Sequence, residues 1–273
     1  MSEEEFLITK EYKRFQEFCE ACRQYKYIGL CYGPPGVGKT LSAKNYSNWG
    51  LIEKIARTNF ISKKQLDIPH DICNTDTMFY TAEVVTSPSQ ILNAINNNTL
   101  MMVDVRSQAK NYHSKQQKNS NSESDFDNYT HPSLVIIDES DRLKLNALEQ
   151  IRDYYDKHHC GLILIGMPGM EKKLSRYPQL YSRVGFVHEF KSLSQEEMIF
   201  IMKNNISEFF AALDPKDFTD HEVIAAIVQV TRGNFRLLNR LLKQVERIMK
   251  INMLKTLTKE VILSARECLV IGV

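Results

Sequence analysis

The stretch from Gly33 to Thr40 constrains this chain more than any other, and it reads G-P-P-G-V-G-K-T. It fits the pattern G-x-x-x-x-G-K-[ST] of loops that bind phosphate. Gly36 and Gly38 lack a Cβ, so the backbone can turn several N–H groups onto one phosphate. Lys39 can reach the β- and γ-phosphates of a nucleoside triphosphate, and the Thr40 hydroxyl is suited to Mg²⁺. The motif therefore predicts ATP and Mg²⁺ as cofactors.

The surroundings of this motif favour a phosphate loop over a chance Gly/Pro turn. A strand-like run, 27–32, precedes it and a plausible helix, 41–46, follows it, which is the order that the motif requires. The helix would add its positive N-terminal end to the site. The residues predicted to contact the nucleotide are Gly33, Pro34, Pro35, Gly36, Val37, Gly38, Lys39, Thr40 and Leu41.

A second site motif is the run Leu134 to Ile137, which ends in Asp138 and Glu139. A continuous apolar run is typical of a strand buried on both faces. Placed about 95 residues after a phosphate loop, an apolar strand ending in two carboxylates indicates a Walker B arrangement. Asp138 would then hold Mg²⁺ together with Thr40, and Glu139 would act as the general base toward water. Hydrolysis of ATP is the predicted reaction.

Further apolar runs, 78–85, 161–166 and 184–190, alternate with helical patterns. This alternation predicts a parallel α/β sheet flanked by helices. From 191 onward the pattern needs no strand, and helices are predicted around 219–230, 234–251 and 258–269. We therefore expect an α/β domain over 1–190, with a short N-terminal arm and helix, and a small all-helical lid over 191–273.

The stretch 107–131 is rich in Asn, Ser, Lys and Gln and poor in apolar residues. This composition predicts a mobile loop or disordered insertion. Its lysines, among them Lys110, could contact a polyanion, and a plain solvated loop is an equal alternative.

Composition limits the class of protein more than its activity. Of 273 residues, 43% are hydrophobic and 25% are charged, and the net charge of +2 does not by itself indicate nucleic acid binding. Cys19 and Cys22 lie at helical spacing with Phe15 and Phe18, so we interpret them as buried reduced thiols rather than zinc ligands. No signal peptide or membrane-spanning run is evident, which favours a cytoplasmic protein without a membrane partner.

The order of phosphate loop, Asp-Glu strand end, third strand and helical lid resembles the AAA+ ATPases, which are P-loop NTPases. The resemblance implies that Arg183 is an arginine finger acting on a neighbouring subunit, with Arg176 as its competitor. It implies that Arg236, in Gly233-Asn-Phe-Arg, is a sensor 2 residue contacting the nucleotide. A surface arginine is the alternative for Arg183 and a solvated helix residue for Arg236. The third strand ends in Gly166-Met-Pro, so the usual polar sensor 1 residue is missing or displaced.

A finer resemblance is to transposition regulators of the TnsC, TniB and MuB kind. It rests on the stretches 138–143 (D-E-S-D-R-L), 165–174 and 176–185, and it covers about residues 10–250. It implies an ATPase of slow, stimulated turnover that assembles as a ring or filament on double-stranded DNA. The assembly would recruit or activate a transposase, with a target-selector protein as a further partner.

One sequence feature supports DNA binding independently of this resemblance. Arg236, Arg240, Lys243, Arg247 and Lys250 recur at intervals of 4, 3, 4 and 3, which places them in one stripe on a helix. Such a stripe can follow phosphates with little sequence specificity, and a solvated helix face is the alternative. In the related filaments most DNA contacts come from the α/β domain. The candidate DNA-binding residues are Arg106, Lys110, Arg240, Lys243 and Arg247.

Two other functions remain open from the sequence. A helicase loader or an origin-recognition-like ATPase would share the same motifs and would have a replicative helicase as partner. A protein-only nucleotide switch would use ATP without binding DNA. ATP-dependent DNA binding separates the last of these from the other two.

Overall fold

A computed structural model describes residues 6–61, 68–85, 87–116, 131–204 and 207–269. Contacts between Cα atoms divide the chain into two compact units. The first, the α/β unit, comprises Arg14–Gly33 and Lys39–Glu189, and the second, the helical unit, comprises Met1–Lys13, Pro34–Gly38 and Phe190–Val273. Each unit is described by itself.

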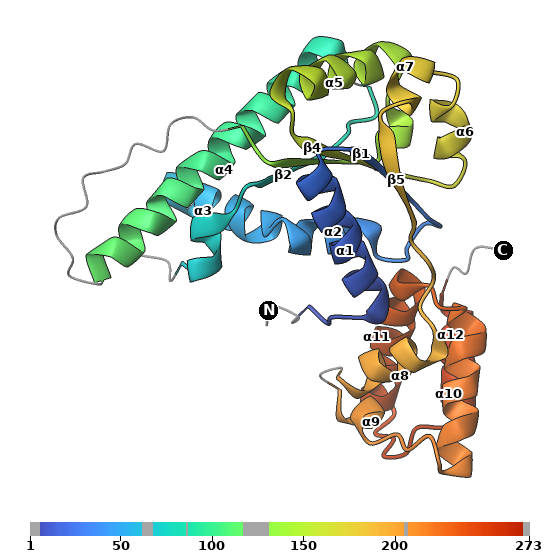
Figure 1. Cartoon of the computed structure of the whole chain (residues 1–273). Helices are drawn as coiled ribbons and strands as arrows, with labels where there is room; N and C mark the ends of the chain where they lie inside the picture. Colours follow the sequence, from blue (N-terminus) through green and yellow to red (C-terminus); the bar gives the residue numbers. More distant parts are fainter. Residues whose placement is uncertain (1–5, 62–67, 86, 117–130, 205–206, 270–273) are drawn as a thin grey trace. The chain divides into compact units, whose positions relative to one another are not determined.

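The α/β unit is built on a five-stranded parallel sheet in the order β2-β3-β4-β1-β5 (Figure 1). The inner strands β1, β3 and β4 are almost wholly buried, as their continuous apolar sequences predict. Edge strand β5 alternates half-buried with exposed residues. The strands are β1 (Ile28–Tyr32), β2 (Thr77–Thr81), β3 (Leu134–Asp138), β4 (Gly161–Gly166) and β5 (Val184–Glu189).

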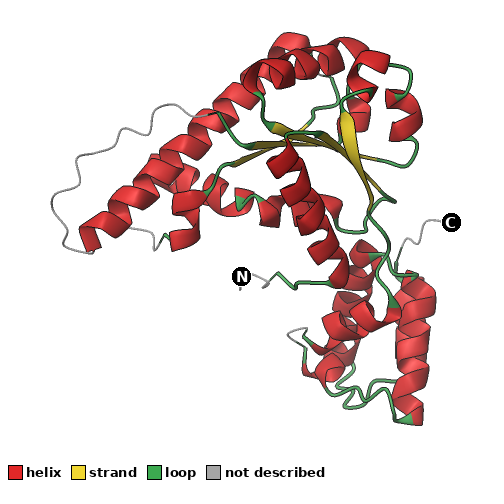
Figure 2. Cartoon of the chain, in the orientation of Figure 1, coloured by secondary structure: helices red, strands yellow, loops and turns green. Residues whose placement is uncertain are grey.

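Helices cover both faces of this sheet, so the predicted α/β class is confirmed (Figure 2). Figure 1 shows α5 and α7 on one face and α2 and α3 on the other. The helices are α1 (Lys10–Tyr25), α2 (Lys39–Tyr46), α3 (Trp49–Ile61), η1 (His70–Asn74), α4 (Pro88–Gln116), η2 (Ser140–Arg142), α5 (Leu145–His158), α6 (Met170–Leu174) and α7 (Pro178–Tyr181).

The helical unit contains no strand among its described residues, as the sequence predicts. Its buried core joins residues from all of its helices, and Leu7 of the N-terminal segment packs against this core. The predicted helix start at Ser194 is confirmed, because Ser194 and Glu197 form a reciprocal capping box. The helices are α8 (Gln195–Lys203), α9 (Glu208–Ala211), α10 (Phe218–Thr231), α11 (Phe235–Ile251) and α12 (Lys259–Glu267).

Two local predictions were wrong. Residues 107–116 are not a loop but continue helix α4, where the buried side chains Met102, Val105 and Ala109 sustain the helical period. The remainder, 117–130, lies outside the described residues. Strand β2 ends at Thr81 rather than Val85, and Val84 and Val85 are largely exposed.

The main division of the chain falls at Phe190, but two earlier segments also group with the helical unit. These are the N-terminal residues up to Lys13 and the loop Pro34–Gly38, whereas the sequence analysis placed both with the α/β part. Cys19 and Cys22 are fully buried thiols, and the described residues form no cluster of three or more metal-ligating side chains. None of the described helices is long and apolar enough to cross a membrane.

Candidate functional site

The phosphate loop follows the end of β1 and leads into α2, which begins at Lys39. Gly36 has a φ of 80° and Gly38 a φ of 112°, a region of backbone space that favours glycine. The Lys39 ammonium donates to the Gly33 carbonyl at 2.7 Å, so its side chain reaches back to the first residue of the motif. Val37 is buried and Leu41 is about half exposed. The loop thus has the positive-φ conformations that glycine permits without strain.

The end of β3 lies against the start of α2 within the α/β unit. The Thr40 hydroxyl donates to Asp138 Oδ2 at 2.7 Å, across 98 residues of sequence. The Glu139 backbone N–H donates to the other carboxylate oxygen, Oδ1, at 2.9 Å. Asp138 is 2% exposed, so both of its oxygens are directed by these neighbours rather than by water. The structure thus brings together the two residues predicted to hold a metal ion.

Glu139 has a left-handed backbone with a φ of 54°. A left-handed conformation is uncommon for a residue with a Cβ, so the surrounding structure must hold Glu139 in it. The Glu139 carboxylate lies 3.4 Å from Arg142 Nη2, and the Arg142 guanidinium also donates to the Ala82 carbonyl. Arg142 therefore holds the carboxylate of the predicted general base, a role that the sequence analysis missed.

Burial dominates the electrostatics of the site. Desolvation raises the pKa of Asp138, although hydrogen bonds from Thr40 and from the Glu139 backbone oppose the shift. Desolvation also lowers the pKa of Lys39, and the carboxylates of Asp138, Glu139 and Asp141 oppose that shift. A cation in front of Asp138 would favour its ionised form. Carboxylate and hydroxyl oxygens are ligands that Mg²⁺ accepts, so Asp138 and Thr40 fit a magnesium ion.

Asp141 is a second residue that the sequence analysis did not place in the site. Its Oδ1 accepts from the Met167 N–H at 3.2 Å, so a carboxylate lies at the tip of β4, where the sequence analysis took the polar sensor residue to be missing or displaced. The Lys173 ammonium donates to the carbonyls of Asp141 and Leu143, both at 2.7 Å. The pattern D-E-S-D-R-L was a usable signal, because its second aspartate follows the strand end by only three residues.

Arg183 lies at the opposite end of the sheet from the phosphate loop. Its carbonyl accepts from the N–H of Ile28 at the start of β1, whereas the loop follows the end of that strand. At about 3.3 Å per residue, the five steps from Ile28 to Gly33 separate these points by roughly 16 Å. Arg183 is therefore well separated from the end of β1 that leads into the phosphate loop.

The Arg183 guanidinium is held in place within the α/β unit. Its Nε and Nη2 donate to the two oxygens of Asp156 at 2.6 and 2.9 Å, and its Nη1 donates to the Gln179 carbonyl. Asp156 also accepts from Arg152 at 2.9 Å. Arg183 remains one-third exposed, and its competitor Arg176 is an exposed residue outside strand β5.

Arg236 lies in the first turn of α11 and its side chain is exposed. Its backbone N–H, rather than its guanidinium, donates to the Gly36 carbonyl at 2.9 Å, and both residues belong to the helical unit. The neighbouring Asn234 donates its amide to the Pro35 carbonyl at 2.9 Å. The segment that carries the predicted sensor 2 residue thus contacts the phosphate loop directly.

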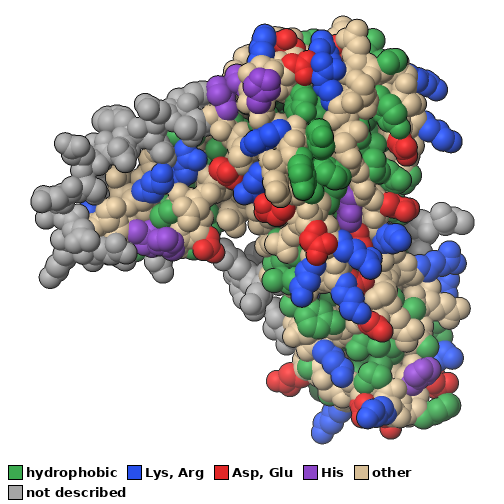
Figure 3. All heavy atoms as spheres, viewed as in Figure 1, with side chains coloured by type: hydrophobic (Ala, Val, Ile, Leu, Met, Phe, Trp, Pro, Cys, Tyr) green, Lys and Arg blue, Asp and Glu red, His purple; other side chains and the backbone are tan. Residues whose placement is uncertain are grey.

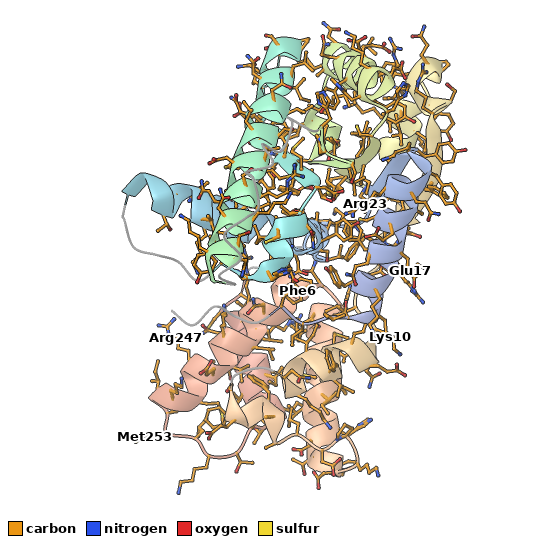
Figure 4. All side chains as sticks on the ribbon, turned by 60° about the vertical axis from the view of Figure 1, so that its left-hand side comes forward. Phe6, Lys10, Glu17, Arg23, Arg247 and Met253 are labelled. Carbon is orange, nitrogen blue, oxygen red and sulfur yellow. The ribbon has the colours of Figure 1, made fainter. Side chains whose placement is uncertain are left out.

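The predicted basic stripe forms one exposed face of α11. Arg236, Arg240, Lys243, Arg247 and Lys250 are all exposed, while the opposite face buries Leu238, Leu241, Leu242, Val245 and Met249. Lys250 is paired with Glu246 at 2.6 Å. Figure 4 shows the Arg247 side chain projecting away from its helix. On the face of the helical unit seen in Figure 3, Lys and Arg side chains are interspersed with Asp and Glu.

The two DNA-binding candidates on α4 differ. Lys110 is exposed and could meet a phosphate. Arg106 is 8% exposed, and its guanidinium donates to the Thr75 carbonyl. The Arg106 head group is thus buried against the α/β unit, which argues against its predicted role as a DNA contact.

Comparison with known proteins identifies related sequences. Residues 22–174, more than half of the chain, match the family model described as AAA domain. A protein of Staphylococcus aureus described as "Potential ATP-binding protein" is 46% identical over 270 residues, which cover 98% of this chain and 97% of that protein.

Two solved structures resemble this chain in fold. The RuvB Holliday junction branch migration motor of Thermotoga maritima is 18% identical with a TM-score of 0.55, over 97% of this chain and 70% of that one. The ADP form of the ORC2 protein of Aeropyrum pernix is 15% identical with a TM-score of 0.54, over 92% of this chain and 67% of that one. At these identities the likeness shows a shared fold alone.

Proposed function

This chain belongs to the AAA domain family, and from that premise we propose that it is an ATPase that binds double-stranded DNA in its ATP-bound state. The DNA-bound assembly would recruit or activate a transposase. The observation that carries the DNA-binding part is the exposed basic face of α11 opposite a wholly apolar buried face. The nucleotide part is carried by the hydrogen bond between Thr40 and Asp138.

ATP binding is supported by the loop geometry and by the relative described as ATP-binding. The loop N–H groups and the N-terminus of α2 would receive the phosphates, and the Lys39 ammonium would exchange the Gly33 carbonyl for phosphate oxygens. Thr40 and Asp138 would hold Mg²⁺, and the ion would supply positive charge that offsets the charge of the phosphates. The low exposure of Asp138 favours such a cation over an uncompensated carboxylate.

Hydrolysis would use Glu139 as general base toward water. In the structure its carboxylate is engaged by Arg142, so the two must separate, or share the carboxylate, when water is activated. Arg183 would supply positive charge to the γ-phosphate of a neighbouring subunit, since it lies at the far end of its own sheet. This division of the site between two copies requires a homo-oligomer, and we propose a ring or a filament.

The transposition role is supported by three short stretches, 138–143, 165–174 and 176–185, which resemble transposition regulators. The first of them supplies side chains of the candidate site, because Asp138, Glu139, Asp141 and Arg142 all lie at the ends of β3 and β4. A replication role, in which the partner is a helicase rather than a transposase, would use the same nucleotide chemistry. A pull-down with a purified transposase and, separately, with a purified replicative helicase distinguishes the two roles.

The decisive measurement is binding to a labelled random-sequence duplex by fluorescence anisotropy, with ATP, ADP or no nucleotide, across a salt series. The test variant replaces Arg240, Lys243 and Arg247 by Gln. The control replaces Lys203, Lys216 and Lys259 by Gln. These are exposed lysines of the same unit outside α11, so the control lowers the net charge by the same amount as the test variant. We expect ATP-dependent binding in the wild type. In the test variant the salt slope should fall by about one for each side chain that no longer neutralises a phosphate.

Two outcomes would contradict this proposal. If the protein binds no DNA in any nucleotide state, it acts as a protein-only switch and the α11 stripe is a solvated face. If both triple variants weaken binding equally, net charge rather than the stripe determines affinity. Electron micrographs of the same samples would test for rings or filaments.

A further inference from the structure

The carbonyl side of the phosphate loop has its own binding partners. A loop that receives phosphate uses its N–H groups for that purpose, and its carbonyl oxygens would repel the same phosphate. Those carbonyls therefore need donors elsewhere. Within the helical unit, two consecutive carbonyls find them at the start of α11: Pro35 at the Asn234 side chain and Gly36 at the Arg236 backbone N–H, both at 2.9 Å.

Asn234 makes two different hydrogen bonds with one side-chain amide. Its Nδ2 donates to the Pro35 carbonyl, and its Oδ1 accepts from the Leu237 N–H at 3.0 Å, which caps α11. These two bonds fix the orientation of the amide, because a flip that exchanged its nitrogen and oxygen would break both of them. The Asn234 side chain thus joins the phosphate loop to the first turn of α11, beside the backbone bond from Arg236 to Gly36.

Gly36 shows how close this approach is. A Cβ placed on Gly36 would lie 2.6 Å from Asn234 Oδ1 and 3.0 Å from its Nδ2, and Gly36 also has a φ of 80°. The glycine therefore serves two purposes, since it allows the turn of the loop and leaves room for the amide.

We propose that Asn234 is a positioning residue for nucleotide binding: its amide holds the Pro35 carbonyl of the phosphate loop away from the phosphates, so that the loop N–H groups are oriented in advance for ATP. The inference rests on ATP binding at this loop and is independent of DNA. Asn234 does not touch the nucleotide. It lowers the cost of ordering the loop when ATP binds.

Helix capping alone is the competing explanation, and one substitution separates the two roles. Asn234→Ser keeps a good N-cap, because Ser and Asn cap helices about equally well. The Ser hydroxyl is one atom shorter than the amide and leaves the Pro35 carbonyl without its donor. The matched control is Asp217→Ser, the same kind of cap replacement at α10. Among the described residues, the Asp217 side chain accepts from the N–H groups of Thr219 and Asp220, both in the first turn of its own helix.

The first readout is the Kd of a fluorescent ATP analogue, measured with the full-length protein. Removal of one hydrogen bond predicts binding about three- to tenfold weaker for Asn234→Ser. We expect no change for Asp217→Ser. The second readout is hydrogen exchange without nucleotide: amides of 33–40 should exchange faster in Asn234→Ser, while amides of α11 keep wild-type protection.

Each other outcome overturns the proposal in its own way. Wild-type affinity and exchange in Asn234→Ser would show that the hydrogen bond to Pro35 does not order the loop. Faster exchange along α11 in the same variant would show a capping role. If the wild-type protein itself binds no ATP, the proposed function fails, and this is seen before any variant is compared.

Discussion

Asp138 is a buried carboxylate, and its burial has a consequence for stability. Its pKa is raised by desolvation, so the folded protein binds a proton more tightly here than the unfolded chain does. The free energy of unfolding therefore decreases as the pH rises from about 3.9, the value of a free aspartate, through the raised folded value. At neutral pH the buried, ionised Asp138 carboxylate therefore lowers the free energy of unfolding, and we relate this lower stability to its proposed role as a metal ligand.

The first prediction is that Asp138→Asn raises the thermal stability of the nucleotide-free protein at pH 7.5. The neutral amide avoids the cost of burying a charge. Its oxygen can accept from the Glu139 N–H while its NH2 group donates to the Thr40 hydroxyl, which can reverse its role from donor to acceptor. Thermal unfolding with and without Mg²⁺-ATP is the measurement, and the gain should shrink toward pH 4. Asp153→Asn, an exposed position of α5, serves as control. A less stable Asp138→Asn protein at pH 7.5 would refute the argument.

Glu139 supports a second prediction at this scale. Glu139→Gln keeps the shape of the side chain but removes the base, so ATP should bind normally while phosphate release slows by about 10²- to 10⁴-fold. Nucleotide affinity and single-turnover phosphate release separate the two effects. Glu171→Gln, an exposed carboxylate of α6, is the control. Wild-type turnover in Glu139→Gln would remove this residue from the catalytic role.

At the scale of elements, helix α5 is joined to the start of β5 by the pair Asp156–Arg183. The pair uses two parallel hydrogen bonds, the geometry in which an arginine–carboxylate interaction is strongest. Both side chains are about one-third exposed, so water and salt weaken the attraction. The pair also limits the rotamers of Arg183, which matters if this residue must contact a second subunit.

The third prediction concerns this pair. Asp156→Asn should lower the free energy of unfolding by about 1 kcal/mol, and less at high salt. A double-mutant cycle with Arg183→Gln measures the coupling directly by denaturant unfolding. Asp153→Asn should stay within about 0.5 kcal/mol of wild type. Zero coupling in the cycle would mean that the pair does not hold Arg183.

At the scale of the whole molecule, the proposed role of Arg183 as an arginine finger would make ATP hydrolysis a property of the assembly. A subunit with Lys39→Ala keeps its arginine but cannot bind ATP, and a subunit with Arg183→Ala binds ATP but lacks the arginine. Each variant alone should be inactive. The fourth prediction is that an equal mixture recovers activity, with about a quarter of the interfaces productive if assembly is random.

Steady-state phosphate release over a range of total protein concentration is the measurement for this mixture. Activity should rise more steeply than linearly with concentration, since both subunits must meet. A mixture of Lys39→Ala with Arg176→Ala is the control, because Arg176 is the competing candidate for the arginine finger. If Arg183→Ala alone keeps wild-type turnover, or if the Arg176 mixture behaves as predicted for Arg183, the finger has been assigned to the wrong residue.

The sequence by itself determined the parts of this protein that depend on residues close together in the chain. The phosphate loop, the strand ending in Asp138 and Glu139, the capped start of α8 and the amphipathic α11 each follow from local pattern. Backbone freedom of glycine, burial of apolar runs and side-chain capping act over a few residues, so a pattern in the sequence carries them.

The tertiary structure alone decided which distant residues meet. The amide of Asn234 reaches the Pro35 carbonyl across 199 residues, and Arg142 engages both Glu139 and the segment that follows β2. Arg106 was predicted as a DNA contact, but its guanidinium is buried and donates to the Thr75 carbonyl, 31 residues earlier in the chain. Such contacts depend on strand order and helix packing, which no short pattern encodes, because they are set by how all the apolar faces are buried together.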